Sequence, residues 1–586
     1  MLMLVLLLGI GVLLFRAGYL EVFQQSWLQA QADKRQMRTV TVPPYRGVIV
    51  DRNGESLAIS SPVESISVDP KKLLDVRNKL QKIIHSGSRD DSRLASMDMV
   101  DLDRKLQKME SILGMEEGGL LDKLNALSTR RFYYLARQVE PERAQEIADL
   151  NVPTVNTLRE YRRFYPMAET TAHVVGFTDI DDKGIEGVER SMNKVLAGRA
   201  GRNRVVRDGH GRLVESVEHM ERMVPGKAVE LSLDHRIQYH AYKLLKGEVY
   251  KLNAKSGSVV VLDTQTGEVL AMASMPSFNP NNRASMKPYQ TRNRAVVDAF
   301  EPGSTLKPLT IAAALEARVI DKNVLIETSG KLEIGKTVVK DHKNYGTITL
   351  SRLLAKSSNV GASKVALLMK PVDHWKFLSR VGFGRKPDAG FSSETQGELS
   401  YYTSWGKVDR ASHGYGYGVS VSLLQLAHAY SVFATGGVLK PVTIFKQKSP
   451  LSGQRVMLEK NARAVLTMMR AVVQSDATGK NAVVDGYHVA GKTGTARKYM
   501  NGRYSKTHMV VSFVGIAPVS NPRLVVAVMI DEPKVEKVSG GRLAAPLFSK
   551  IMANALRIMD VPPDALPEIK QAKEQTRHVV AQEVNR

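Results

Sequence analysis

The chain has 586 residues and a formal net charge of +24, with 83 lysines and arginines against 59 aspartates and glutamates. This length exceeds one ordinary domain, and a hydrophobic content of 43% is enough for a large core. The absence of cysteine excludes disulfides, thiolate catalysis and cysteine-ligated metal sites.

The first segment, residues 1–22, predicts an uncleaved membrane anchor. Residues 1–15 are all apolar, and the apolar run resumes after Arg16. About twenty residues cross a bilayer if the Arg16 side chain extends toward the headgroups. Ala30-Gln-Ala32 resembles a signal-peptidase site, but it lies too far beyond the apolar run for a signal peptide.

Residues 31–226 mix predicted short strands and helices and contain no catalytic set. The polar stretch 86–92 predicts a loop inside an inserted helical lobe. Pro225-Gly226 predicts a turn at a domain boundary. We therefore expect a non-catalytic domain over 31–226 and a second domain over 227–567.

The second domain is predicted to contain a β-hairpin near its start, with strands at 258–262 and 268–272. After Pro567 the chain is charged, and the tail 568–586 is expected to be mobile.

A serine motif follows at Ser304-Thr-Leu-Lys307. Glu301-Pro302-Gly303 predicts a turn, and the Ala- and Leu-rich stretch 309–316 predicts a helix. Residues three positions apart share a helix face, so Lys307 would reach the Ser304 hydroxyl. This spacing makes Ser304 a candidate nucleophile and Lys307 a candidate base.

A lysine base needs a lowered pKa, which burial and a second cation such as Lys492 would provide. A lone S-x-x-K is usually only a helix surface. Ser191-Met-Asn-Lys194 matches the same pattern. The motif therefore carries weight only together with the two that follow.

Ser357-Ser358-Asn359 begins 53 residues after Ser304, between predicted helices at 348–356 and 361–368. A polar triplet between helices is often only a cap. In a catalytic site, Ser357 would relay a proton and the Asn359 amide would hold a substrate amide.

Lys492-Thr493-Gly494-Thr495 begins 135 residues after Ser357 and follows 487–490, which alternates like a strand. A strand edge carrying Lys492, Thr493 and Thr495 can bind an extended peptide by strand addition and hold its carboxylate. Gly494 allows backbone or ligand to come close. The backbone N–H groups of Ser304 and Thr495 would form an oxyanion hole.

The same residues also match a nucleotide-binding pattern. The stretch 486–493 fits G-x-x-x-x-G-K-[ST], and 524–532 resembles a metal-binding strand. A P-loop opens a helix at once, whereas Gly494 and the turn Asn501-Gly502 follow here. The predicted strands 509–516 and 524–530 are joined by about seven residues, a hairpin length, while the P-loop core is parallel. We therefore expect no nucleotide hydrolysis.

The three motifs in this order resemble those of class A β-lactamases and penicillin-binding proteins. The chain resembles the division-specific class B penicillin-binding proteins from about Arg46 to the region of Pro562. The shared stretches are 46–54, 132–139, 184–189, 301–304 and 416–418.

The resemblance implies a multi-domain α+β chain. Its parts would be an N-terminal transmembrane helix, an elongated α/β pedestal and a transpeptidase domain with an antiparallel sheet flanked by helices.

The resemblance also implies septal peptidoglycan cross-linking. Ser304 would attack the penultimate D-Ala carbonyl of a stem pentapeptide, the terminal D-Ala would leave, and an amine of a neighbouring strand would attack the acyl-enzyme. β-Lactams would acylate the same serine, and no cofactor or metal is implied. An elongation-type transpeptidase, a D,D-carboxypeptidase and a non-enzymatic division scaffold or β-lactam sensor remain as alternatives.

The expected location is the bacterial inner membrane, with the catalytic domain in the periplasm. The net charge suits attraction to anionic lipid and an acidic wall rather than nucleic acid. Expected partners are a glycosyltransferase of the FtsW type and other division proteins. No basic residue precedes the anchor, whereas Lys34, Arg35 and Arg38 follow it. The positive-inside rule then predicts that the natural chain starts upstream of Met1 with a basic tail.

Overall fold

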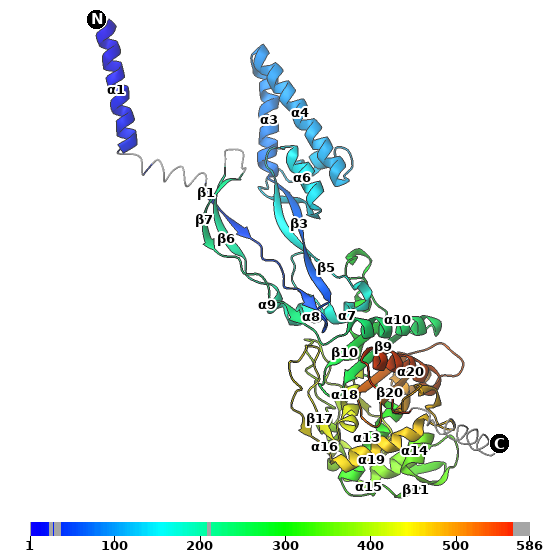
Figure 1. Cartoon of the computed structure of the whole chain (residues 1–586). Coiled ribbons are helices and arrows are strands. Elements are labelled where there is room, and N and C mark those ends of the chain that lie inside the picture. Colours follow the sequence, from blue (N-terminus) through cyan, green and yellow to red (C-terminus); the bar gives the residue numbers. More distant parts are fainter. Residues whose placement is uncertain (1, 23–26, 28–36, 208–212, 566–586) are drawn as a thin grey trace, which may run out of the picture. The chain divides into compact units, whose positions relative to one another are not determined.

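The computed structural model describes residues 2–22, 27, 37–207 and 213–565 (Figure 1). The chain divides into two compact units. Unit 1 comprises Met1–Val48, Ile59–Phe164 and Lys194–Lys227, and unit 2 comprises Ile49–Ala58, Tyr165–Asn193 and Ala228–Arg586. The predicted domain limits at 22, 226 and 567 stay predictions. The predicted tail 568–586 lies outside the described residues, as do Met1, Lys34 and Arg35.

The predicted anchor segment is helical and forms α1 (Leu2–Val22). Among the helices of the described ranges, none has the combined length and apolarity that a membrane crossing requires. The transmembrane helix predicted for residues 1–22 is therefore not confirmed.

Unit 1 contains two groups of antiparallel strands. The first is a three-stranded sheet of order β1-β6-β7, with β1 (Met37–Val42), β6 (Gly201–Arg207) and β7 (Leu213–Glu221). In the second, β3 (Ser56–Val68) pairs through its residues 59–68 with β5 (Val155–Phe164) and also with β4 (Tyr133–Val139).

A helical lobe packs on these strands. It consists of α3 (Pro70–Ser86), α4 (Arg89–Leu113), α5 (Gly119–Ala126) and α6 (Pro141–Asp149). Leu73, Leu106, Leu120 and Ile147 share its apolar core with Ile66 of β3.

The predicted loop 86–92 is wrong in extent, because Arg89–Ser92 are helical. Ser88 caps α4 by accepting the Asp91 N–H at 3.2 Å. Acidic residues in the first turn favour this helix end.

Unit 2 is built on a five-stranded antiparallel sheet of order β10-β9-β21-β20-β19. Its strands are β9 (Ser256–Asp263), β10 (Val269–Met275), β19 (Ala490–Met500), β20 (Arg503–Ala517) and β21 (Leu524–Asp531). The predicted hairpin β9–β10 and the predicted antiparallel pair β20–β21 are confirmed. The strand predicted at 487–490 is wrong, because β19 begins only at Ala490 and contains the Lys492 motif itself.

Helices cover both faces of this sheet, as its fully buried central strands require. One face packs on α10 (His235–Lys251) and α20 (Gly540–Ile558), with Phe513 against Phe548. The helix α18 (Leu423–Ala434) contacts β9 and β21. The predicted antiparallel sheet flanked by helices is confirmed.

The other elements of unit 2 surround this core. Its further helices are α7 (Ala172–Val175), α8 (Gly187–Ser191), α11 (Pro288–Thr291), α12 (Arg294–Val297), α13 (Lys307–Glu316), α14 (Leu350–Lys356), α15 (Asn359–Leu368), α16 (Pro371–Arg380), α17 (Lys407–His413) and α19 (Glu459–Arg470). Its short strands are β2 (Ile49–Val50), β8 (Val229–Glu230), β11 (Leu325–Thr328), β12 (Lys331–Ile334), β13 (Thr337–Lys340), β14 (Gly346–Thr349), β15 (Glu398–Leu399), β16 (Val419–Ser420), β17 (Val438–Leu439) and β18 (Gln454–Arg455). The short helix α9 (Asn193–Leu196) follows α8, and single 3-10 turns are η1 (Ala168–Thr170), η2 (Arg283–Ser285), η3 (Gly303–Leu306), η4 (Tyr402–Ser404), η5 (Ala471–Val473) and η6 (Lys480–Ala482).

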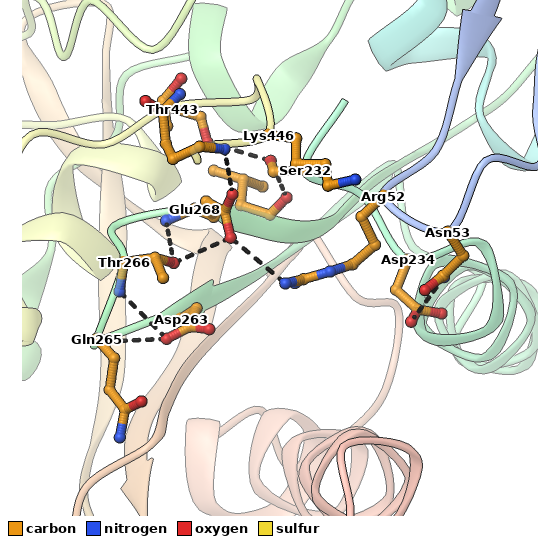
Figure 2. A network of polar contacts seen from close by, with 12 residues as sticks. Arg52, Asn53, Ser232, Asp234, Asp263, Gln265, Thr266, Glu268, Thr443 and Lys446 are labelled. Atoms are coloured by element: carbon orange, nitrogen blue, oxygen red, sulfur yellow. Dashed lines mark hydrogen bonds and ion pairs between the residues drawn. The ribbon is translucent and has the colours of Figure 1, made fainter. Parts of the chain in front are cut away.

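Residues 49–58 are part of unit 2 although they lie far from it in sequence. Asp51 is 1% exposed and accepts the N–H groups of Asn53 at 2.7 Å, Glu55 at 2.9 Å and His235 at 3.1 Å. Figure 2 shows the neighbouring contacts, in which Arg52 reaches Glu268 at 3.5 Å. These bonds attach the segment to the N-terminus of α10 and to β9–β10.

Asp51, Asp234 and His235 lie close enough together to hold a metal ion. Protein donors already occupy the carboxylate oxygens, however. Asn53 Nδ2 donates to both carboxylates, at 3.1 Å and 3.2 Å, and Arg236 pairs with Asp234 at 2.6 Å. These three residues are therefore interpreted as a hydrogen-bonded junction between the segment 49–58 and the N-terminus of α10.

Replacing Asp51 by asparagine is expected to cost about 2 kcal/mol of stability at pH 7, because charge-assisted bonds to a buried carboxylate are lost. Burial opposes the charge of Asp51, but the bonds from His235, Glu55 and Asn53 outweigh it and lower the pKa. A lowered carboxyl pKa contributes its full stabilisation above the pKa of the unfolded chain, about 3.9, and this stabilisation is lost as the pH falls through the lower pKa of the folded state. The difference between variant and wild type should therefore shrink as the pH falls below about 4.

Calorimetric unfolding of the full chain at pH 7 and pH 3.5 measures this effect. Asp485→Asn, at an exposed site of unit 2, is the matched control. Equal unfolding temperatures for wild type and Asp51→Asn at pH 7 would contradict the expectation.

Candidate active site

The three predicted motifs meet at the hydroxyl of Ser357. Ser357 Oγ lies 3.0 Å from Ser304 Oγ, 3.1 Å from Lys307 Nζ and 3.1 Å from Lys492 Nζ. These residues come from η3, the start of α13, the junction of α14 and α15, and β19. One small group thus contacts the candidate nucleophile and both lysines.

Ser304 lies in η3, whose turn leads directly into α13. The first N–H groups of such a helix have no acceptor within it, so they are available to an anion. Two hydrogen bonds involving backbone atoms of the turn hold it in place. Gly303 N donates to Gly416 O at 3.0 Å, and the buried Tyr430 hydroxyl donates to Thr305 O at 2.5 Å. Gly416 has φ of +91°, and a Cβ there would lie 2.0 Å from Gly303 O, so only glycine fits.

Lys307 is completely buried at the start of α13. Its Nζ donates to Ser357 O at 2.6 Å and Asn359 Oδ1 at 2.7 Å, besides Ser357 Oγ. Burial lowers the pKa of Lys307 well below its ordinary value, and the charge of Lys492 lowers it further. A lowered pKa increases the fraction of Lys307 in the neutral form that a base requires. Among the described contacts Lys307 reaches Ser304 through Ser357, and its role as the base stays a prediction.

Ser357 has a backbone conformation that is unusual for a serine, with φ of +58° and ψ of +42° at the end of α14. Left-handed backbone in a residue other than glycine costs about 1–3 kcal/mol and is found where a functional group must be placed. The bonds Ser357 N to Leu354 O (3.2 Å) and Ser358 N to Leu353 O (3.1 Å) hold this turn. The predicted helices on either side of the triplet are confirmed.

Asn359 positions Lys307 and the neighbouring hairpin. Its Oδ1 accepts from Lys307 Nζ, and its Nδ2 donates to Lys340 O at 3.3 Å. The predicted contact of this amide with a substrate stays a prediction.

Asp341 is a site residue that sequence reasoning missed. Its carboxylate accepts Ser358 Oγ at 2.5 Å, Asn359 N at 2.5 Å and Val360 N at 3.1 Å. It therefore anchors the start of α15, and its charge acts against the lowering of the Lys307 pKa. No motif spacing marks this aspartate, so only the fold reveals it.

Lys492 is completely buried in β19, with burial lowering its pKa to about 7. Besides Ser357 Oγ, its Nζ contacts Thr493 O and Thr493 Oγ1, both at 3.2 Å. In the described part of the chain no carboxylate pairs with it. A buried cation without a counter-ion is costly unless it loses its proton or binds an anion.

The two threonines of this motif have different contacts. Thr493 Oγ1 donates to Thr478 Oγ1 at 3.3 Å, so its proton is used within the protein. Thr495 Oγ1 accepts Gly540 N at 3.1 Å and keeps its own proton for another acceptor. Gly494 lies between them, where a Cβ would come within 2.2 Å of Ser512 Oγ and 3.0 Å of Thr305. Glycine here lets β19 approach both β20 and the Ser304 turn.

The topology also decides against a P-loop. Lys492 and Thr493 lie inside a strand rather than at the start of a helix, and β19, β20 and β21 are antiparallel neighbours. The observed topology is therefore not that of a P-loop core, whose strands are parallel.

A second missed group joins the Ser304 turn to β20. Glu301 accepts Gly418 N at 2.7 Å and the Tyr504 hydroxyl at 3.0 Å, and burial raises its pKa. The Tyr504 ring lies 5.0 Å from that of Tyr417, whose hydroxyl accepts Arg497 N at 3.1 Å. The stretches 301–304 and 416–418, both among those that carry the resemblance, thus form one wall beside β19.

Comparison with known proteins agrees with this geometry. Residues 257–553 match the penicillin-binding protein transpeptidase domain, and residues 41–231 match the penicillin-binding protein dimerisation domain. The chain belongs to the class B penicillin-binding proteins. Ser304, Ser357 and Lys492 all lie within the matched transpeptidase domain of this penicillin-binding protein.

Its relatives match over nearly the whole length. The chain is 39% identical over 553 residues to the probable peptidoglycan D,D-transpeptidase PenA of Neisseria meningitidis, covering 94% of this chain and 91% of that protein. It is 38% identical over 562 residues to the peptidoglycan D,D-transpeptidase FtsI of Escherichia coli, covering 96% and 92%. The structure of penicillin-binding protein 3 from Mycobacterium tuberculosis, complexed with aztreonam, has 26% sequence identity and a TM-score of 0.67 over 90% of this chain and 98% of that one.

Proposed function

We propose that this penicillin-binding protein is a peptidoglycan D,D-transpeptidase that forms septal cross-links through an acyl-enzyme on Ser304. The observation that carries the proposal is the Ser357 hydroxyl, which lies within 3.1 Å of Ser304 Oγ and of both buried lysines. The names of the FtsI and PenA relatives support the same activity.

In the first step the donor peptide adds to the edge of β19. The Lys492 ammonium and the Thr495 hydroxyl hold its terminal carboxylate, while Thr493 positions Lys492. Ser304 Oγ attacks the penultimate carbonyl and gives its proton to neutral Lys307 through Ser357. The N–H groups of Ser304 and Thr495 stabilise the oxyanion. The proton then passes to the leaving nitrogen, and D-alanine departs.

In the second step an amine of a neighbouring peptide takes the place of D-alanine. Lys307, neutral again, removes a proton from the amine as it attacks the ester carbonyl. The bond to Ser304 Oγ breaks, the serine regains its proton, and a new amide remains as the cross-link. A β-lactam acylates Ser304 by the first step alone, because its leaving nitrogen stays tethered.

Ser304→Ala is expected to abolish covalent labelling by a fluorescent penicillin. Labelling is read on a denaturing gel, and mass mapping of the wild-type adduct should place it on the peptide containing Ser304. Ser191→Ala, in the second S-x-x-K, is the matched control and should label normally. An adduct on another residue would overturn the site.

Product analysis separates the alternative activities. With a stem pentapeptide and an amine acceptor, a transpeptidase yields a cross-linked product together with D-alanine. D-alanine without a cross-link would indicate a carboxypeptidase. If Ser304→Ala still supported septum formation in cells, a scaffold would explain the protein better.

We also propose that the protein acts at the bacterial inner membrane, anchored by residues 1–22, with unit 2 in the periplasm and an FtsW-type glycosyltransferase among its partners. The apolar composition of residues 1–15 supports this location. Protease treatment of spheroplasts tests this location, because added protease should digest unit 2 only if it lies on the periplasmic side of the inner membrane.

A further inference from the structure

The hairpin of β12 and β13 and the residues after it carry positive charge that the catalytic contacts do not use. We call residues 331–343 the basic hairpin. Lys336, Lys340 and Lys343 are exposed, and within the described residues none of them has a carboxylate partner. Lys331, by contrast, pairs with Glu333 at 2.9 Å. Asp341 faces the catalytic triplet and therefore does not neutralise the lysines beside it in an ion pair.

The basic hairpin is fixed to the catalytic residues. Asp341 accepts three donors from residues 358–360, and Lys340 O accepts Asn359 Nδ2 at 3.3 Å. Val339 and Ile334 are buried in one apolar cluster with Val360. The same Asn359 side chain contacts Lys307. The basic hairpin, which carries the exposed lysines, is therefore held beside the Asn359 end of the site.

We propose that the basic hairpin binds carboxylates of the donor peptide upstream of the attacked carbonyl, so that anionic donors acylate the enzyme faster than neutral ones. This inference rests on the proposed function. Lys492 takes the terminal carboxylate of the donor, and the donor residues before the attacked bond pass Asn359 toward the hairpin. A cluster of unpaired cations there attracts upstream carboxylates and raises the local concentration of such peptides.

The test uses two synthetic donors ending in D-Ala-D-lactate. They differ only in whether one upstream residue is glutamate or glutamine. The acylation rate of the full-length protein is measured with each donor by mass spectrometry of the acyl-enzyme. In wild type the anionic donor should react about five-fold faster at low salt, since each exposed charge pair contributes modestly. The ratio should approach one in about 0.5 M salt, because the charges are screened.

Variants identify the residues responsible. The triple variant Lys336→Gln, Lys340→Gln and Lys343→Gln should bring the ratio close to one, with the glutamine donor as internal reference. The double variant Lys331→Gln, Glu333→Gln removes an ion pair of the same hairpin without changing its net charge, and it should keep the ratio. Charge reversal by Lys336→Glu alone should also lower the ratio. This single substitution provides an independent test if the triple variant does not fold.

Three results would overturn the inference. They are equal rates for both donors in wild type, a ratio unchanged in the triple variant, and a ratio lost equally in the double variant Lys331→Gln, Glu333→Gln. A wild type that labels with penicillin but accepts neither donor would instead contradict the proposed function itself, so the two failures are distinguishable.

Discussion

Lys307→Gln is expected to lower the rate of acylation by penicillin at least about 1,000-fold, which is within the range for loss of a general base. Glutamine keeps donors toward Ser357 and Asn359 but cannot accept the Ser304 proton at neutral pH. Lys307→Arg should be as inactive, because guanidinium stays protonated in proteins. Stopped-flow or mass-spectrometric acylation rates measure both variants.

The loss of penicillin acylation in Lys307→Gln should occur while the variant remains folded. Lys307 is completely buried, and removing a buried amine removes a desolvation cost, so the melting temperature of Lys307→Gln should not fall far. Acylation within ten-fold of wild type in a folded variant would rule out Lys307 as the base. A second base would then have to be sought among the neighbours of Ser357.

Lys492→Ala is expected to lower penicillin acylation about 100-fold, because the buried cation that binds the carboxylate is lost. The pH profile gives a sharper result. Burial lowers the pKa of Lys492 to about 7, and a lysine holds its proton only below its pKa. The acylation efficiency of wild type should therefore fall as the pH rises above about 7, and this descending limb should be absent in Lys492→Ala.

Lys307 produces the opposite limb, because it must be neutral to act as a base, and burial together with the charge of Lys492 lowers its pKa well below the ordinary value. The wild-type profile should therefore be bell-shaped. Second-order acylation rates between pH 5 and pH 10 measure both limbs. A descending limb that persists unchanged in Lys492→Ala would assign it to another group.

Local sequence patterns predicted the parts of the site that depend on neighbouring residues. The helix after Ser304, the two helices around Ser357 and the hairpin of β20 and β21 follow from helix propensity, capping and loop length. The order of the three motifs along the chain then indicated that their side chains come together in one active site.

The remaining features depend on contacts between distant residues. Asp341, the Glu301–Tyr504 bond and the membership of residues 49–58 in unit 2 carry no signal of their own in the sequence. A strand was expected from residue 487 because apolar and polar residues alternate over 487–490. The pairing with β20, however, begins only at Ala490, where β19 starts. Helix spacing predicted that Lys307 lies near Ser304, but not that the Ser357 hydroxyl bridges the two side chains.

The position of β19 has a consequence for the stability of the protein in solution. It is the outermost strand of its sheet in the described structure, so one side of its backbone has no strand partner. Such an edge is also the surface on which identical chains can stack and aggregate. The segment of β19 that carries the Lys492 motif is buried beside the Ser304 turn, so the part of this edge that could template such stacking is the exposed end of the strand, residues 497–500.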